Sequence, residues 1–419
     1  MSAKKKLHIC VVGSTYPRHD DDYAVPWLRE SVRQMVQAGH RVTVLAPSYQ
    51  GLGDHEIDGV AVKRFRYAPA GIERLTHEQG APNRIRNPLY QALAVPYVLN
   101  GCRVGRKLGR EQNFDVVHVH WPFPHGPIGR AVAKASNAPL LMTAHGAEFA
   151  LARRKKWVAP LLRKALRQAD HLVANSNDTA SKIKELSGCD ATVVPFGTTV
   201  FPKHSPTPAN PRPRVAFTGR LIERKGVEYL LRAIPRILSK CDTDFFITGS
   251  GDQREKLEAL AANLGITERV RFLGFVSNEK LNEVYARCDV WVNPSIIDSR
   301  GDTEGLGVGA IEAYAHRKPV VASAVGGIPD AVRHGETGWL VPQKDERTLA
   351  NAILNLLQNP ARAEQFGEAG LEFAQREFNW TRLTRKLEAI YFDSMTEFGQ
   401  KYQEVATPSP APQLAHAIG

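Results

Sequence analysis

Two glutamates eight positions apart, Glu304 and Glu312, enclose a run of small and apolar residues in DTEGLGVGAIEA, residues 302–313. Glu304 precedes Gly305 and Gly307, where a helix is not expected to have begun, whereas Glu312 lies among good helix formers. We therefore expect a helix that begins after the glycines and carries Glu312 about two turns in. The ordinary alternative is a capped helix with one acid near its N-terminus and a second acid in solvent.

Two cations stand at another strand-to-helix junction, in TGRLIERKGVEYLL. Arg220 follows an expected strand and Lys225 introduces the next helix, whose free N–H groups and dipole favour an anion such as a diphosphate. Gly249, in the GSG after the next expected strand, allows a ligand to approach the backbone. The two glutamates suit hydroxyl groups. Hydroxyls near two acids and phosphates near two bases describe a nucleotide sugar, and the alternative is a surface loop rich in charge.

The chain lacks the fingerprints of several other classes of protein. Neither CVVGSTYP nor the GSG segment follows the GxGxxG pattern of dinucleotide-dependent dehydrogenases. The DTD at residues 242–244 precedes a strand instead of following one, so we expect no metal site. We also expect no cofactor, because a nucleotide sugar would be a substrate. The net charge of +12 favours an anionic partner. Without a groove-reading module or an aromatic RNA motif, nucleic acid is a poor candidate for that partner.

Length and composition favour two globular domains. The chain has 419 residues, which is more than one hydrophobic core usually serves. Its composition, 43% hydrophobic and 23% charged, is typical of a globular protein. Its five cysteines are scattered and never spaced as CxxC, which indicates a reducing compartment. The N-terminus lacks the apolar run of a signal peptide, and no stretch approaches the ~20 apolar residues of a membrane span. We expect a cytoplasmic protein, free or peripheral on the cytoplasmic face of a membrane.

Short β-branched runs alternate with helical patterns, which is typical of parallel βαβ units. The expected strands fall at residues 7–13, 41–47, 60–67, 114–121, 139–146, 171–176, 191–197, 214–220, 244–251, 269–275, 289–295 and 319–324. The pattern predicts an α/β protein of two doubly wound Rossmann-like domains facing each other across a cleft. Its expected parts are a first domain at 1–197, a Pro-rich linker at 198–213, a second domain at 214–379, a helix at about 380–403 and a disordered tail at 404–419.

The segment from Glu304 to Glu312 resembles the E-x7-E motif of the retaining family-4 glycosyltransferases, also called group 1, which have the GT-B fold. GRLIERKG resembles the phosphate-binding segment of that family, and GHRVTVLAP, TAHG, KPVVASAVGGIPD and HGETGWLVP stand in the family order. The resemblance runs from about residue 7 to 395 and ends in an F-x-W helix that crosses back to the first domain. It implies transfer of a sugar from a nucleotide sugar, with UDP favoured and GDP possible, to a hydroxyl of a glycan, lipid-linked or small-molecule acceptor.

The resemblance also implies roles for individual residues. Glu312 would accept hydrogen bonds from the ribose, and Glu304 would contact the donor sugar. Arg220 and Lys225 would neutralise the diphosphate as charge builds on the leaving group. His145, in TAHG, resembles the first-domain histidine that faces the donor sugar, although a lone histidine is more often structural. Further contacts to the donor, through the base-binding FLGFV loop and the glycine loops, are expected from Gly13, Gly249, Phe275, Val276, Gly305, Leu306 and Gly307.

The first loop departs from the family pattern. Many members carry Gly-Gly there, whereas this chain reads GSTYPRHDDDYAVPW and keeps only Gly13 of the expected glycines. Asp20 and Asp22 are candidates for binding hydroxyls of the acceptor, which the first domain handles in this fold. The alternative is a solvated run of charge.

A basic segment at residues 151–170 is a candidate surface for an anionic membrane. It combines Trp157 with seven cations, and its second part has apolar residues at helical spacing. Core packing and a solvated face explain the same pattern, so the two interpretations remain open. The cations are Arg153, Arg154, Lys155, Lys156, Arg163, Lys164 and Arg167.

Two rival functions remain open at this point. A sugar-nucleotide epimerase of the same fold would release its product without an acceptor. A non-catalytic sugar-binding protein would not need the acids and bases that this chain keeps.

Overall fold

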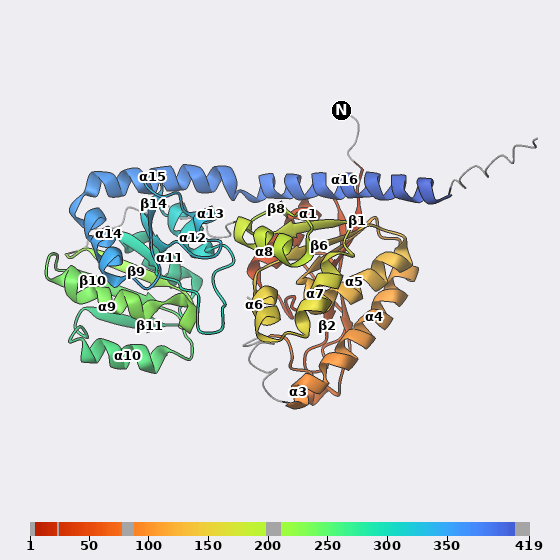
Figure 1. Ribbon diagram of the computed structural model, residues 1–419, viewed down its shortest axis with the longest axis horizontal. Coiled ribbons are helices and arrows are strands. Elements are labelled where there is room, and N and C mark those ends of the chain that lie inside the picture. Colours follow the sequence, from red (N-terminus) through yellow and green to blue (C-terminus); the bar gives the residue numbers. More distant parts are fainter. Residues whose placement is uncertain (1–4, 23–24, 78–87, 198–210, 407–419) are drawn as a thin grey trace, which may run out of the picture.

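The computed structural model describes residues 5–22, 25–77, 88–197 and 211–406 (Figure 1). The alternation of strands and helices that the sequence predicts is confirmed, and it forms two α/β domains. Most of the predicted linker at 198–213 and of the predicted tail at 404–419 lies outside the described residues.

The first domain is built on a sheet that has, among the described residues, eight strands in the order β3-β4-β2-β1-β5-β6-β7-β8. Its neighbouring strands run parallel except for β3 and β4, which form an antiparallel pair. The central strands are apolar and almost fully buried because helices cover both faces. The strands are β1 (His8–Val12), β2 (Arg41–Pro47), β3 (His55–Ile57), β4 (Val60–Phe65), β5 (Val116–His120), β6 (Leu140–Ala144), β7 (His171–Ala174) and β8 (Thr192–Val193).

Seven helices of the described chain pack around this sheet before the linker. They are α1 (Pro26–Gln37), α3 (Pro88–Ala92), α4 (Ala94–Glu111), α5 (Pro122–Ser136), α6 (Ala147–Arg154), α7 (Val158–Leu166) and α8 (Asn177–Ser187), with a 3-10 turn at Ala70–Ile72.

The second domain is built on a parallel sheet that has, in the described chain, six strands in the order β11-β10-β9-β12-β13-β14. Its strands are β9 (Arg214–Thr218), β10 (Asp244–Thr248), β11 (Val270–Gly274), β12 (Val290–Asn293), β13 (Val320–Ser323) and β14 (Gly338–Val341). Its helices are α9 (Val227–Leu238), α10 (Arg254–Asn263), α11 (Asn278–Arg287), α12 (Val308–Ala315), α13 (Ile328–Ala331), α14 (Glu346–Gln358) and α15 (Pro360–Glu377), with a 3-10 turn at Glu223–Lys225.

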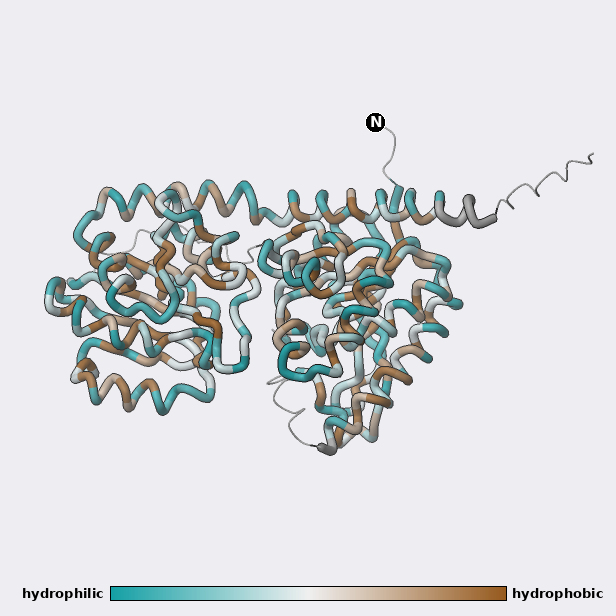
Figure 2. Tube along the Cα trace, in the orientation of Figure 1, coloured by the Kyte–Doolittle hydropathy of each residue, from teal (hydrophilic) through white to brown (hydrophobic). Residues whose placement is uncertain are grey.

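The last helix, α16 (Trp380–Ala406), returns to the first domain and lies across it (Figure 1). Figure 2 shows hydrophobic residues recurring along α16 between hydrophilic ones. Leu383, Leu387 and Tyr391 are buried in the same core cluster as β1 and α1. This apolar stripe fixes α16 to the first domain although the helix follows the second domain in sequence.

The structure corrects two details of the sequence prediction. Glu312 is the fifth residue of α12, so it lies little more than one turn into the helix and not two. The short strands β3 and β14 were not predicted, because three or four residues next to turns carry too little periodicity.

Candidate functional site

The candidate site lies where the strand order of the second sheet reverses. β9 and β12 are far apart in sequence but pair at the centre of the sheet. The loop after β9 carries Arg220 and Lys225, and the loop after β12 carries Glu304. Open α/β sheets bind ligands at such a switch point, outside the carboxyl ends of the strands.

Glycines let the loops of this edge approach each other closely. A Cβ on Gly249 would lie 1.9 Å from the carbonyl oxygen of Gly219, and one on Gly226 would lie 2.0 Å from that of Pro294. Both glycines also have positive φ, at 114° and 61°. Side chains would therefore separate the loops after β9, β10 and β12.

Glu304 is buried, with 6% of its surface exposed. Its Oε1 accepts hydrogen bonds from Arg224 Nη1 at 2.7 Å and Ser295 Oγ at 3.1 Å, and it lies 2.7 Å from Lys225 Nζ. Burial by itself would raise the pKa of Glu304, but the charges of Arg224 and Lys225 outweigh it and lower this pKa to about 2. Among the described residues no group bonds Oε2, so this oxygen is available to a ligand hydroxyl.

Arg224 is a member of this cluster that the sequence analysis missed. It stands beside Lys225 in LIERKG, and the 3-10 turn that ends at Gly226 directs both cations at Glu304. Arg220 differs from both, because its side chain makes no ion pair or hydrogen bond with another described residue. Burial and the charge of Arg224 lower its pKa, while the charge of Glu304 opposes this change. Asp302 lies 3.6 Å from Arg224 and completes this ion cluster, so the described edge of the sheet holds two acids and two cations with Arg220 beside them.

Glu312 is held by a directed chain of hydrogen bonds. Trp291 Nε1 donates to Thr218 Oγ1 at 3.0 Å, and Tyr285 Oη donates to Glu312 Oε2 at 2.6 Å. The Thr218 hydroxyl completes the chain by donating to Tyr285 Oη at 2.7 Å. Burial raises the pKa of Glu312, while the bond from Tyr285 opposes this rise. The chain fixes the carboxylate from behind and was not predictable from the acids alone.

The loop that carries Glu304 meets the first domain at Gly305. A Cβ on Gly305 would lie 2.9 Å from the carbonyl oxygen of His145 and 2.8 Å from Asn175 Nδ2. Arg153 Nη2 also donates to the Gly301 carbonyl at 2.6 Å. The structure therefore brings His145 of the first domain next to the loop that holds Glu304.

His145 lies in an aromatic cage. The ring centroids of Trp27 and Trp121 both lie 4.8 Å from that of His145, and Phe196 stacks on it at 5.5 Å. Burial lowers the pKa of His145 to about 3. The imidazole is therefore neutral at physiological pH and serves as a hydrogen-bonding group.

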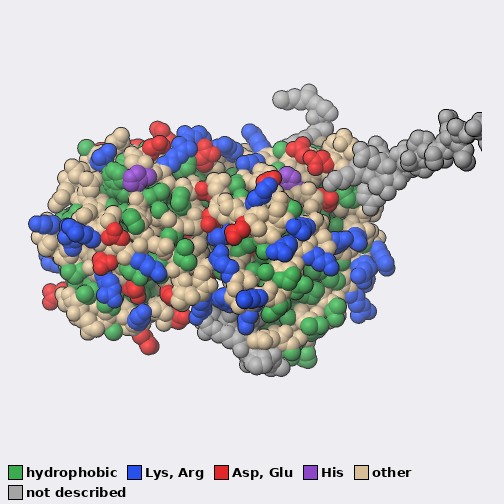
Figure 3. All heavy atoms as spheres, in the orientation of Figure 1, with side chains coloured by type: hydrophobic (Ala, Val, Ile, Leu, Met, Phe, Trp, Pro, Cys, Tyr) green, Lys and Arg blue, Asp and Glu red, His purple; other side chains and the backbone are tan. Residues whose placement is uncertain are grey.

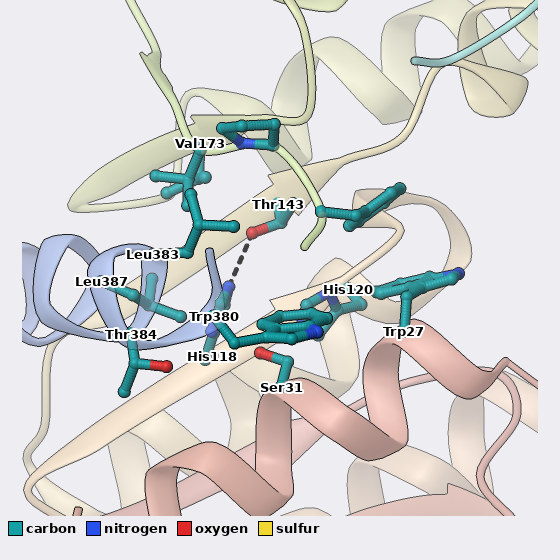
Figure 4. A pocket seen from close by; sticks show the side chains of 13 residues that line it. Trp27, Ser31, His118, His120, Thr143, Val173, Trp380, Leu383, Thr384 and Leu387 are labelled. Atoms are coloured by element: carbon teal, nitrogen blue, oxygen red, sulfur yellow. Dashed lines mark hydrogen bonds between the residues drawn. The ribbon is translucent and has the colours of Figure 1, made fainter. Parts of the chain in front are cut away.

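Two further histidines connect His145 with the crossing helix. His145 Nε2 lies 3.1 Å from His120 Nδ1, and the ring of His120 lies 4.4 Å from that of His118. His118 bonds Thr143 Oγ1 at 2.7 Å and, from α16, Tyr391 Oη at 2.8 Å. Figure 4 shows His118 and His120 lining a small cavity beneath the first turns of α16. No sequence signal linked these histidines to Tyr391.

Four buried polar atoms around this junction have no hydrogen-bond partner in the described structure. They are Nδ1 of His145, Oε2 of Glu148, Oδ1 of Asn175 and Oγ1 of Thr303. Glu148 Oε1 accepts from the backbone N–H of His145 at 2.9 Å, so one carboxylate oxygen is used and the other is free. Burial raises the pKa of Glu148 to about 7. Unpaired buried polar atoms are rare in proteins, and a cluster of them indicates a place for a polar ligand.

Of the residues that the first loop was predicted to contribute to ligand binding, Asp22 and Gly13 are buried and Asp20 is exposed. Asp22 is buried and bonded to Arg18, whose Nε donates at 2.7 Å, so it is not a solvated charge, and its binding of acceptor hydroxyls stays a prediction. Asp20 is exposed beside Arg29, at 3.9 Å. Gly13 is buried at the end of β1, where Trp121 Cζ3 lies 3.8 Å from the position of a Cβ.

The predicted donor contacts of the second domain lie on the same edge of the sheet. Phe275 is 84% exposed on the loop after β11, and Val276 beside it is half-buried. Leu306 is buried in the core, so only its backbone faces the loop. Gly307, with φ of 85°, is the residue that caps the N-terminus of α12.

The DTD segment is occupied by ion pairs. Asp242 lies 2.6 Å from Arg212 and 2.8 Å from Arg269, on the side of the sheet where β10 begins. Both cations thus pair with the carboxylate of Asp242. The described residues contain no group of three or more His, Cys, Asp or Glu side chains that is arranged to hold a metal ion.

The basic segment at 151–170 forms α6, a short loop and α7. Arg163 and Arg167 donate to the carbonyls of Leu186 and Ser187 at 2.8 Å, which caps the end of α8. Trp157 is 60% exposed. Three of the seven cations, including Arg153, are thus engaged within the protein. No helix in the described part of the chain is long and apolar enough to cross a membrane.

The fold defines a class of protein: the GT-B proteins, with two Rossmann-like domains that face each other across a cleft. Solved structures support the fold. Sucrose-phosphate synthase from Thermosynechococcus elongatus superposes with a TM-score of 0.76 over 94% of this chain and 100% of its own, at 23% identity. HepE from Anabaena, solved in complex with UDP, gives a TM-score of 0.70 over 92% and 100%, at 17% identity.

Sequence comparison gives the family. Residues 27–200 match the profile described as Glycosyltransferase Family 4, and residues 212–359 match Glycosyl transferases group 1. A relative from Mycolicibacterium smegmatis, a GDP-mannose-dependent alpha-(1-6)-phosphatidylinositol monomannoside mannosyltransferase, is 29% identical over 87% of this chain and 93% of its own. Glycogen synthase from Mycobacterium tuberculosis is 28% identical over 85% and 87%. The chain belongs to the family-4, group 1 glycosyltransferases.

Proposed function

We propose that this protein transfers a sugar from a nucleoside diphosphate sugar to a hydroxyl acceptor with retention of the anomeric configuration and without a metal. UDP-sugars and GDP-sugars are the donors to test first, because one relative acts on GDP-mannose and a neighbour of the same fold was solved with UDP. The acceptor is a hydroxyl of a glycan, a lipid-linked sugar or a small molecule.

The observation that carries the proposal is the half-used carboxylate of Glu304. Two cations and a serine hydroxyl bond its Oε1, which keeps the acid ionised, while Oε2 is left to a ligand. Unpaired polar atoms of His145 and Asn175 are present on the loops of the first domain that adjoin Gly305. An ionised acceptor opposite neutral polar groups suits the hydroxyls of a sugar.

In the proposed reaction, Arg220 and Lys225 stabilise the diphosphate as the bond between the anomeric carbon and the phosphate oxygen breaks. The acceptor hydroxyl attacks the same face of the sugar, and its proton passes to the departing phosphate oxygen. Glu304 Oε2 and His145 Nδ1 orient the donor sugar, and Glu312 binds the ribose hydroxyls. The contribution of the protein is then positioning and charge stabilisation, with closure of the domains excluding water.

Gly13, Gly249, Gly305, Leu306 and Gly307 are proposed to contact the donor through their backbones, and Phe275 and Val276 to border the base. Asp20 and Asp22 are proposed to bind hydroxyls of the acceptor, with Asp22 held in place by Arg18. A lipid-linked acceptor would be presented at a membrane, for which Arg154, Lys155, Lys156 and Lys164 remain available on α6 and α7.

A mass-spectrometric screen of UDP-, GDP- and ADP-sugars in EDTA tests the proposal. We expect one donor to lose its sugar to water or to an added acceptor, because protein cations serve the phosphates. Loss of activity in EDTA with recovery on adding manganese or magnesium would overturn the metal-free assignment. Interconversion of the nucleotide sugar without release of nucleoside diphosphate would favour the epimerase, and binding without turnover would favour the sugar-binding protein.

A further inference from the structure

The helices α4 and α5 approach each other closely along a stripe of glycines. Gly101, Gly105 and Gly109 recur at every fourth position of α4 and face α5. Cβ atoms at these positions would lie 2.5 Å from Ile128 Cδ1, 3.0 Å from Val132 Cγ2 and 2.6 Å from the Val132 carbonyl oxygen. Larger residues would separate the helices, so the stripe brings their outer faces together.

A groove between these outer faces is lined by four cations. Arg106 and Arg110 come from α4, and Arg130 and Lys134 come from α5. None of the four makes an ion pair or a side-chain hydrogen bond with another described residue. Figure 3 shows Lys and Arg side chains gathered at the right-hand edge of the molecule, where these helices lie. Unpaired like charges that a packed scaffold holds together destabilise one another unless an anion joins them.

The same face of α4 exposes two aliphatic side chains. Val95 is 63% exposed and Leu99 is 64% exposed. Val95 and Leu99 are separated from each other, and from Arg106 and Arg110, by nearly whole helical turns. All four side chains therefore lie on one side of α4, opposite the buried Tyr97 and Leu108. Helix-dipole effects explain cations in the last turns of α4 and α5, but they do not explain exposed aliphatic residues in line with them.

We propose that the groove between α4 and α5 binds the phosphate headgroup of an anionic lipid, with Val95 and Leu99 entering the bilayer interface beside it. Cations next to exposed aliphatic residues match an amphiphile that carries a phosphate next to an acyl chain. A free phosphate would use the cations and leave the aliphatic pair unexplained. The purpose of this membrane contact rests on the proposed function: a first domain bound to the membrane would meet an acceptor that a lipid carries.

The test is cosedimentation of the full chain with phosphatidylcholine vesicles that do or do not contain phosphatidylglycerol. We expect the protein to bind the anionic vesicles at low salt, and Arg106→Ser with Arg130→Ser to weaken this binding on the order of 30-fold, about fivefold for each basic residue. A matched control, Arg232→Ser with Arg347→Ser, removes the same charge from exposed positions of the second domain and should bind as the wild type does. Val95→Ser with Leu99→Ser should weaken binding in high salt as well as in low salt.

Three results would overturn the proposal: a wild-type protein that stays in the supernatant, a groove variant that binds as well as the control, or full displacement from vesicles by millimolar glycerol 3-phosphate. A third variant, with Arg154, Lys155 and Lys156 changed to Ser, distinguishes the groove from the basic segment. If this variant loses vesicle binding and the groove variant does not, the membrane contact belongs to α6 and α7. Hydrolysis of the nucleotide sugar is measured in parallel. A groove variant that keeps this activity but loses vesicle binding supports the lipid site, whereas inactivity of every protein counts against the proposed function.

Discussion

Glu304→Gln separates the structural role of the ion cluster from its role in binding a donor. The change keeps the size of the side chain and its ability to accept from Ser295, but it removes the negative charge between Arg224 and Lys225. These two side chains are only 14% and 17% exposed, so water replaces the lost charge poorly.

The expected magnitude follows from the burial and the pKa of Glu304. Removing one partner of a buried ion pair costs about 3–5 kcal/mol. Lowering a carboxyl pKa from 4.5 to about 2 corresponds to about 3 kcal/mol, which agrees with the lower end of that range. For a domain of this size, 1 kcal/mol shifts Tm by roughly 2–4 °C, so the variant should melt about 6–20 °C lower. Because this stability depends on an ionised Glu304, the wild type should also lose it as the pH falls from the ordinary carboxyl pKa toward 2.

The assay is thermal unfolding with and without a nucleoside diphosphate. A diphosphate supplies the negative charge that the variant lacks, so the rise in Tm on adding UDP or GDP should be larger for Glu304→Gln than for the wild type. Turnover should still fall on the order of 10²-fold, because the acceptor for the donor sugar is lost. The control Glu228→Gln breaks a surface ion pair with Lys256 and should cost less than about 1 kcal/mol. The reasoning would be refuted if Glu304→Gln had the same Tm as this control, or if its Tm rose less on adding nucleotide than that of the wild type.

Four further changes test other parts of the site. Glu312→Ala should raise the donor KM with a smaller loss in kcat, as steady-state kinetics will show, because ribose contacts serve the ground and transition states alike; an effect on kcat alone would exclude this role. Arg220→Ala should cost on the order of 10²-fold in turnover at saturating donor, and a loss below threefold would return Arg220 to an ordinary surface cation. The amide of His120→Asn takes the place of the Nδ1 atom that bonds His145, whereas the longer side chain of His120→Gln does not. The Asn variant should therefore keep most of kcat, and the Gln variant should lose about tenfold. Equal losses in kcat at equal Tm would contradict the positioning of His145 by His120. The folded protein keeps a proton on Glu148 between pH 4.5 and about 7 that the unfolded chain loses. Urea titrations should therefore show the stability of the wild type falling, relative to that of Glu148→Gln, by up to about 3 kcal/mol through that window, whereas buried histidines such as His145 affect both proteins alike.

The sequence predicted the fold well because local patterns determine it. Buried strands are short apolar runs between turns, and the strands that carry the site end at glycine or proline. Glu304, Arg220 and Lys225 follow such ends, so the parallel topology is enough to bring them to one edge of the sheet. Glu312 was placed on the correct helix, but its distance from the helix start depends on where the glycines end.

The remaining parts of the site depend on contacts that no local pattern encodes. The sequence shows two adjacent cations in LIERKG, but only the turn at Gly226 aims Arg224 at Glu304. The bond between His118 and Tyr391 joins residues 273 positions apart. Asp22 was expected at the acceptor or in solvent, and its bond to Arg18 became visible only in the folded loop.

The most direct test of the central claim is the stoichiometry of a single turnover. With excess enzyme and a donor found by the screen, mass spectrometry quantifies the nucleoside diphosphate released and the glycoside formed on the acceptor, and proton NMR gives the anomeric configuration. We predict equal amounts of nucleoside diphosphate and glycoside, and a glycoside with the same anomeric configuration as the donor. Glu304→Gln should form both products far more slowly than the wild type. Nucleoside diphosphate without glycoside, an inverted configuration, or an undiminished rate in the variant would contradict the proposed transfer at Glu304.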